Sequence, residues 1–308
     1  MKIKWPWLKE ATRKKAQHAG LRNRVAEMKM ARAARGLIHK DNPSLSVIIH
    51  SFNHRENIVP MIRSLERIPT IEELIISEDG SLDGSLEEWL RHLEKPNHFL
   101  IRSNDIHEMR SYDRAIGLAR APIFCLLQDD DVFCGTPWVE PVLALFAKYP
   151  KLAIVGGNLA SGRISPHFPD GLYGKDITSR DPEIDIPFRF VESAAFGPFF
   201  MRKDVYRELG GFDYSMSQPG HNCINTDSEI CYRAWDRGYA VGLAHIPFDR
   251  SSIKGGSHIF SKDSRDIDAT IRTRKIISDK YDSSFKDIHD KVCRANERLV
   301  PIAEAQLL

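Results

Sequence analysis

The sequence lacks the features that mark three common classes of protein. No apolar run approaches the ~18–20 residues that a membrane-spanning helix needs. The first residues contain no apolar core of the kind found in secretory signal peptides, so we expect a cytoplasmic protein. Neither Gly-x-Gly-x-x-Gly nor Gly-x-x-x-x-Gly-Lys-[Ser/Thr] occurs, and a bound nucleotide would therefore not be held by a glycine cradle.

Cysteine is scarce and shows no spacing typical of a metal or redox site. The five cysteines form no Cys-x-x-Cys pair and are odd in number: Cys125, Cys134, Cys223, Cys231 and Cys293. Free thiols in a reducing cytosol are the simplest interpretation. The 308 residues, 42% hydrophobic and 28% charged, suit one α/β domain with extensions or two modest domains.

Charge is distributed unevenly along the chain. Residues 1–40 carry twelve Lys/Arg and two Glu, whereas the remaining residues carry 32 basic and 40 acidic side chains. Within residues 1–40, three apolar residues recur at helical spacing: Leu21, Val25 and Met28. With Trp5 and Trp7, which suit a headgroup interface, this pattern predicts a basic amphipathic helical arm over 1–42 that contacts a membrane surface. A helix packed on its own domain is the second interpretation, and an arm that binds RNA is the least favoured.

From residue 45 onward, apolar runs alternate with amphipathic segments. The runs predict strands, and the apolar repeat of about 3.6 residues predicts helices between them. The expected strands are 45–49, 74–77, 99–101 and 123–127, and the expected helices are 56–67, 82–93 and 112–119. This order predicts a doubly wound, mostly parallel α/β sheet, in which right-handed crossovers bring the strand ends to one edge.

Polar residues follow four of the predicted strands, at the edge where such sheets bind ligands. The most acidic group is Asp129-Asp130-Asp131, directly after the apolar run 123–127. Three adjacent carboxylates repel one another, and a hard divalent cation with oxygen ligands commonly relieves such repulsion. A solvated acidic turn is the alternative.

Several segments resemble the family 2 glycosyltransferases of the GT-A fold. Residues 46–53 are similar to the family's opening strand, and residues 75–85 to its Val-Val-Asp-Asp-Gly-Ser-Thr-Asp-Gly segment. The aspartate triplet resembles its Asp-x-Asp motif, residues 209–213 its Gly-Gly-Phe-Asp turn, and residues 225–230 its Glu-Asp-x-Glu-Leu segment. Three positions depart from the family pattern: His50 replaces Pro, Glu78 replaces the first Asp, and Thr226 replaces Glu.

The resemblance, which covers roughly residues 44–245, implies a GT-A-like domain over 43–250. The nucleotide-binding half of this domain would be residues 43–135. The acceptor half, which would contain a mixed sheet, would be residues 136–250. A flexible loop and a helical extension would follow over residues 251–308. The residues assigned to the nucleoside diphosphate sugar are Ser51, Asn53, Asp79, Arg110, Asp129 and Asp130. The ligands assigned to a divalent cation, manganese or magnesium, are Asp131 and His258. Asp79 as a turn cap, Arg110 as a surface residue and His258 as an incidental residue are the alternatives.

The activity that the resemblance implies is inverting transfer of a sugar from a nucleoside diphosphate sugar, with uridine diphosphate the expected nucleotide. The acceptor would be a hydroxyl of a glycan or a lipid-linked acceptor, in surface glycan synthesis. Such transfer needs a general base, for which Asp227 is the candidate and Glu229 the reserve. A helix cap is the alternative role of Asp227. A non-catalytic sugar-nucleotide-binding or scaffold protein, or a nucleotidyltransferase, would be a different class of function.

Overall fold

The structure is a computed structural model that describes residues 44–302, apart from 67, 69, 135–137, 162–170, 218–223 and 250–263. The predicted basic arm lies outside the described residues. No helix in the described part of the chain combines the length and the apolar character that crossing a membrane requires.

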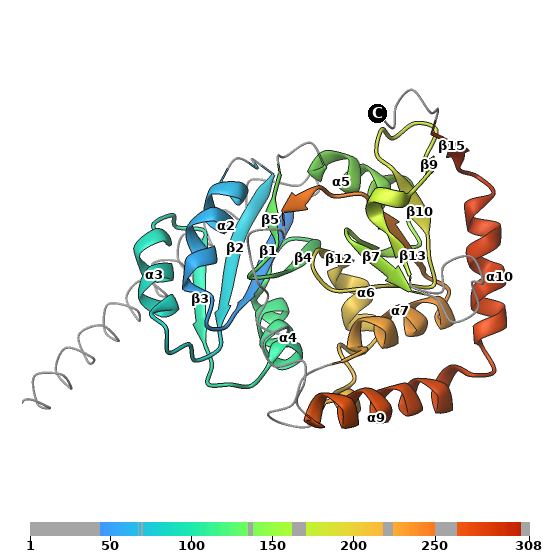
Figure 1. Cartoon of the computed structure of the whole chain (residues 1–308). Helices are drawn as coiled ribbons and strands as arrows, with labels where there is room; N and C mark the ends of the chain where they lie inside the picture. Colours follow the sequence, from blue (N-terminus) through green and yellow to red (C-terminus); the bar gives the residue numbers. More distant parts are fainter. Residues whose placement is uncertain are drawn as a thin grey trace, which may run out of the picture.

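An eight-stranded sheet forms the centre of the described structure, in the order β10-β13-β6-β12-β4-β1-β2-β3 (Figure 1). Its first half is a parallel unit in which β1 lies between β2 and β4. The elements of this half are β1 (Leu45–Ser51), η1 (Arg55–Asn57), α2 (Ile58–Leu65), β2 (Ile71–Glu78), α3 (Ser85–His92), β3 (His98–Arg102), α4 (Glu108–Leu118) and β4 (Ile123–Gln128). The predicted strands and helices of this half are confirmed, with shifted ends.

The second half of the sheet is mixed, as expected. Strand β12 runs antiparallel to both β4 and β6, and β10 runs antiparallel to β13. The elements are β5 (Val132–Phe133), α5 (Val139–Lys148), β6 (Leu152–Gly156), β7 (Leu159–Ser161), β8 (Leu172–Tyr173), η2 (Gly174–Asp176), β9 (Ser179–Arg180), β10 (Phe188–Phe190), β11 (Ser193–Ala194), β12 (Phe199–Arg202), α6 (Lys203–Glu208), η3 (Tyr214–Met216), α7 (Thr226–Asp236), β13 (Ala240–Ala244) and β14 (Phe248–Asp249). The sheet class predicted from the sequence is therefore confirmed.

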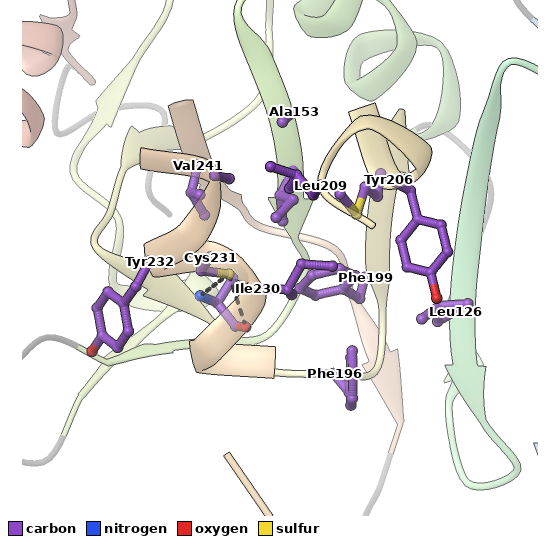
Figure 2. Packing of buried hydrophobic residues seen from close by; sticks show 14 of the residues in the cluster. Leu126, Ala153, Phe196, Phe199, Tyr206, Leu209, Ile230, Cys231, Tyr232 and Val241 are labelled. Carbon is purple, nitrogen blue, oxygen red and sulfur yellow. Dashed lines mark hydrogen bonds between the residues drawn. The ribbon is translucent and has the colours of Figure 1, made fainter. Parts of the chain in front are cut away.

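Helices cover both faces of the sheet, because its central strands are apolar on both sides. In β4, Phe124 and Leu126 belong to one buried cluster, and Cys125 and Leu127 to the other. Helix α7 packs on the first of these clusters, where Ile230 lies close to Phe199 of β12 (Figure 2). Each such buried side chain contributes roughly 1.5–3 kcal/mol relative to an exposed one.

The C-terminal residues form the predicted helices, α9 (Ser264–Tyr281) and α10 (Phe285–Asn296), followed by β15 (Val300–Pro301). Helix α10 runs beside the edge strand β10 (Figure 1). The Asn296 side chain accepts a hydrogen bond from the Phe190 N–H and donates one to the Phe190 carbonyl, both at 2.9 Å. The extension thus satisfies backbone groups that an edge strand would otherwise expose.

Two helices of the first half begin elsewhere than expected. Helix α3 begins at Ser85, not at 82, because Gly84 adopts φ +91° and Asp83 accepts the Ser85 N–H. Helix α4 begins at Glu108, four residues early, after His107 with φ +65°. Arg110, expected in the segment before this helix, therefore lies within its first turn.

Candidate active site

The carboxyl ends of β1, β2 and β4 bring their polar residues to one edge of the sheet, as the alternation predicted. Register shows the alignment, since Ser51 pairs with Glu78 and His50 pairs with Gln128. Helix α4 borders this edge, because the Tyr112 hydroxyl donates to the Leu127 carbonyl at 2.8 Å. The edge is therefore built from strand ends and the start of one helix.

Asp79 holds the entry to α4. Its buried carboxylate accepts the N–H groups of Ile106 and His107, at 3.0 and 2.8 Å, and lies 3.4 Å from Nε2 of His50. Burial acts to raise the pKa of Asp79, but these hydrogen bonds outweigh it and lower the pKa below its usual value. Asp79 is thus ionised and fixed. It does not cap α3, the next helix along the chain.

Glu78 and the two assigned residues at the end of β1, Ser51 and Asn53, form hydrogen bonds that hold the chain around this edge of the sheet. The Glu78 carboxylate accepts the N–H groups of Gly80 and Ser81. The buried Ser51 hydroxyl accepts the Trp89 indole N–H at 2.9 Å, and Asn53 Oδ1 accepts the Leu82 N–H at 2.8 Å. Ligand contacts by Ser51 and Asn53 stay predictions, and in this structure their side chains face protein partners.

Two of the three consecutive carboxylates have separate partners. Asp129 accepts the Phe52 N–H at 2.8 Å and pairs with His54 Nδ1 at 2.9 Å, whereas Asp131, fully buried, accepts the Gln128 N–H at 2.9 Å. The pairing with Asp129 is the main cause that raises the pKa of His54. Separate partners thus relieve part of the repulsion for which the sequence suggested a cation.

Metal ligation by these residues is a separate question. Within the described ranges, no three His, Cys, Asp or Glu side chains are grouped so that they could hold a metal ion. His258, the second predicted ligand, lies outside the described residues. Asp131 contributes a carboxylate at the edge of the sheet where the site is expected, and its role as a metal ligand stays a prediction.

Asp227 is the second residue of α7, and Asn225, with φ +63°, is the N-cap. Its two oxygens accept N–H groups of Ser228 at 2.7 Å and of Phe196 at 3.2 Å. The first bond satisfies one free N–H of the helix start, as the alternative role of a helix cap would require. The second reaches to the loop before β12. Burial, together with the nearby charge of Glu108, raises the pKa of Asp227 to about 6, against the opposing effect of the hydrogen bonds from Ser228 and Phe196.

Glu108 is the site residue that the sequence analysis missed. It opens α4 and accepts a hydrogen bond from the Gln128 side chain at 3.1 Å, which ties the helix to the end of β4. Its charge also acts on His50, whose pKa is raised by Asp79, Glu108 and Asp129 against the opposing effect of burial. The available signal was an acidic residue suited to a helix N-terminus, but the expected helix started too late to use it.

Arg110 and Glu229 have other partners. The Arg110 guanidinium lies 4.6 Å from the Tyr214 ring centroid and 3.4 Å from the Ser217 carbonyl, so it connects α4 to η3. Glu229 is buried, binds Arg233 at 2.6 Å and accepts the Tyr281 hydroxyl at 2.8 Å. A carboxylate so engaged ties α7 to α9, and it is less suited than Asp227 to receive a proton.

A mostly parallel α/β sheet whose carboxylates gather at one edge defines a class of proteins with a ligand site at the strand ends. Within that class, the chain belongs to glycosyl transferase family 2, because the sequence profile of that family matches residues 46–210 of the 308. The resemblance seen in the sequence is thereby confirmed. The match ends before Asp227, so that residue's role does not rest on it.

Individual relatives are distant. Polypeptide N-acetylgalactosaminyltransferase 4 of Caenorhabditis elegans is 24% identical over 209 residues, which are 62% of this chain and 33% of that protein. The chain thus spans about a third of the length of this curated relative. Two similar solved structures, each 13% identical with a TM-score of 0.47, are the mannosyltransferase PcManGT of Pyrobaculum calidifontis in complex with GDP-Man and Mn2+ and residues 1–349 of S. aureus TarS in complex with UDP-GlcNAc. They cover 74% and 65% of this chain, and 64% and 55% of their own chains.

The raised pKa of Asp227 predicts a pH-dependent loss of stability. An aspartate in the unfolded chain has a pKa of about 3.9, so the folded state holds the extra proton between that pH and about 6. The stabilisation is complete below about pH 4 and is lost as the pH rises through 6. Urea titrations should show the unfolding free energy of wild type falling by roughly 1–3 kcal/mol relative to Asp227→Asn between pH 4 and 7.

Asp83 offers a control of opposite sign. Burial acts to raise its pKa, but hydrogen bonds from Ser85 and Arg55 lower it. Wild type should therefore gain stability relative to Asp83→Asn as the pH rises through the acidic range. A difference for Asp227→Asn that stays flat, or that follows the Asp83 slope, would contradict the raised pKa.

Proposed function

We propose that this chain is a metal-dependent inverting glycosyltransferase that moves a sugar from a nucleoside diphosphate sugar to an acceptor hydroxyl. The observation that carries the proposal is Asp227, a carboxylate whose pKa is raised to about 6 at the start of α7, in a chain of glycosyl transferase family 2. The expected acceptors are a glycan or a lipid-linked acceptor.

Asp227 fits the general base. With a pKa of about 6 it is mostly ionised at pH 7, yet it is more basic than an ordinary aspartate. General bases work best when their pKa lies near the operating pH. Its backbone donors from Phe196 and Ser228 fix the carboxylate, which leaves further lone pairs to accept the acceptor's proton.

The nucleotide would lie over the ends of β1 and β2. Asp79 is held by three donors, and a carboxylate has about four lone-pair sites, so one acceptor position stays available for an imino N–H of uracil. This supports uridine diphosphate as the nucleotide. Asp129 and Asp130, both nearly buried at the end of β4, would face the ribose and sugar.

The residues present fit a divalent cation in their chemistry. Magnesium and manganese take oxygen ligands, and magnesium is commonly bound by one or two carboxylates together with substrate phosphates. Asp131 would supply such a carboxylate, with His258 as a second ligand. When bound, the ion supplies charge neutralisation for the leaving diphosphate. The surrounding chain orients the carboxylate, since the Gln128 N–H fixes one oxygen of Asp131.

Nucleotide binding should depend on metal and on Asp131. Uridine diphosphate with manganese should raise the melting temperature, because a ligand at a hundredfold excess over its dissociation constant stabilises by about 2.7 kcal/mol. Chelation should abolish the shift. Asp131→Asn keeps an oxygen for the Gln128 N–H but removes the charge, and it should lose the shift while staying folded. Asp279→Asn, which removes an exposed charge on α9, is the matched control. Equal shifts in both variants would refute the metal assignment, and guanosine diphosphate in parallel tests the choice of base.

Transfer should depend on the basicity of Asp227. Asp227→Asn should bind donor as wild type does but lower turnover by about 10²–10⁴-fold, the usual contribution of a positioned base. Glu229→Gln serves as the comparison on the same helix, since it should lower stability but leave turnover per folded molecule within a few-fold. The assay is a panel of nucleotide sugars with and without manganese, scored for transfer and for slow donor hydrolysis. Donor binding without any turnover in wild type would instead favour a binding protein.

We also propose that residues 1–40 bring the enzyme to anionic membrane surfaces. Each basic residue near such a surface contributes roughly 1 kcal/mol, and salt screens the effect. Vesicles with anionic lipid should co-sediment the full chain but not a chain that lacks residues 1–40, whereas neutral vesicles should bind neither. Equal sedimentation of both chains would exclude the arm, and preferential binding of RNA would favour the nucleic-acid interpretation.

A further inference from the structure

A second group of polar side chains is centred on α10 and shares no residue with the proposed active site. The Cys293 sulfur is 3.5 Å from Nε2 of His289, one helical turn earlier. The other ring nitrogen of His289, Nδ1, is 2.8 Å from a carboxylate oxygen of Glu192. Glu192 directly precedes β11, so a residue from another part of the chain completes the group.

Exposure decreases along this group in the order that a reactive thiol requires. Cys293 is exposed, the His289 side chain is 28% exposed, and the Glu192 side chain is 4% exposed. A reagent in solution can therefore reach the sulfur, whereas the carboxylate is fixed within the fold. Among the other described cysteines, Cys125 and Cys231 are buried and only Cys134 is exposed.

The contacts also select the tautomer of His289. An ionised carboxylate accepts hydrogen bonds but cannot donate them, so Nδ1 carries the hydrogen toward Glu192. Nε2 then has a free lone pair directed at the sulfur, and it can take the thiol proton. A nucleophile next to a base, with a third group that orients the base, is the arrangement that activates weak nucleophiles in proteins.

We propose that Cys293 is a modification site, a nucleophilic thiol that exchanges with low-molecular-weight disulfides. His289 acts as its base, and Glu192 as the positioning residue that holds the imidazole. This proposal does not depend on glycosyl transfer.

The exchange balances without a further reactant. The Cys293 S–H proton passes to Nε2 of His289, and the thiolate attacks one sulfur of the small disulfide. A new sulfur–sulfur bond forms to Cys293 as the bond within the reagent breaks. Cys293 is oxidised, the departing sulfur is reduced to a thiolate, and that thiolate recovers the proton from His289.

The test uses the full chain and oxidised glutathione, with the rate at each cysteine followed by peptide mapping in a mass spectrometer. An ordinary thiol is mostly protonated at pH 7. We expect Cys293 to form the mixed disulfide about tenfold faster than Cys134 at pH 7, because its base lies in contact. The advantage should shrink above pH 9, where an ordinary thiol ionises without the help of a base.

Variants separate activation from a purely structural role. His289→Gln and Glu192→Gln should each lower the Cys293 rate several-fold at pH 7 and leave the Cys134 rate unchanged. Lys291→Gln is the matched control. It removes the ion pair within the same helix in which Lys291 Nζ lies 2.7 Å from an Asp287 carboxylate oxygen, and it leaves the group around the thiol unchanged. Melting temperatures identify any variant that has lost its fold. If one of Glu192→Gln and His289→Gln does not fold, the other variant tests the proposal in its place. The proposal is overturned if Cys293 reacts no faster than Cys134, or if neither variant slows it more than Lys291→Gln does.

Discussion

The burial of β1 and β4 on both faces is the constraint on which the rest of the structure depends. Ile48 and Phe124 belong to the apolar cluster on one face, and Val47 and Cys125 to the cluster on the other. Polar side chains then have no place along these strands except at their ends. The candidate site is thus a consequence of the core, because the residues that cannot be buried without partners collect where the strands stop.

The same constraint explains why the acidic residues of the site are so firmly held. A buried carboxylate is tolerated only when donors satisfy it. Asp79 takes two N–H groups from the entry to α4, Asp129 takes one from Phe52, and Asp131 takes one from Gln128. Each acid therefore positions a different loop, and the charges that the proposed donor would meet are already oriented before it binds.

The sheet was largely predictable from the sequence, because alternating apolar runs report burial directly. The start of α4 was not, since it depends on Asp79, some thirty residues earlier, accepting the N–H groups of Ile106 and His107. Because the predicted helix started too late, Glu108 was also not recognised as a site residue. The separate partners of Asp129 and Asp131 were hidden for the same reason, because His54, the partner of Asp129, follows a different strand. Local pattern predicts elements, whereas side-chain partners depend on which elements the fold brings together.

Asp227 and Glu229 show how such partners decide chemistry. Both are acids in the first turn of α7, and only the family resemblance placed Asp227 ahead of Glu229 as the candidate base. Glu229 faces Arg233 and Tyr281, so a charged group and a hydroxyl already use its oxygens. Asp227 faces the backbone of Phe196 and the charge of Glu108, and its pKa is raised to about 6. Under the proposed function, the difference between these environments would make Glu229 structural and leave Asp227 available for proton transfer.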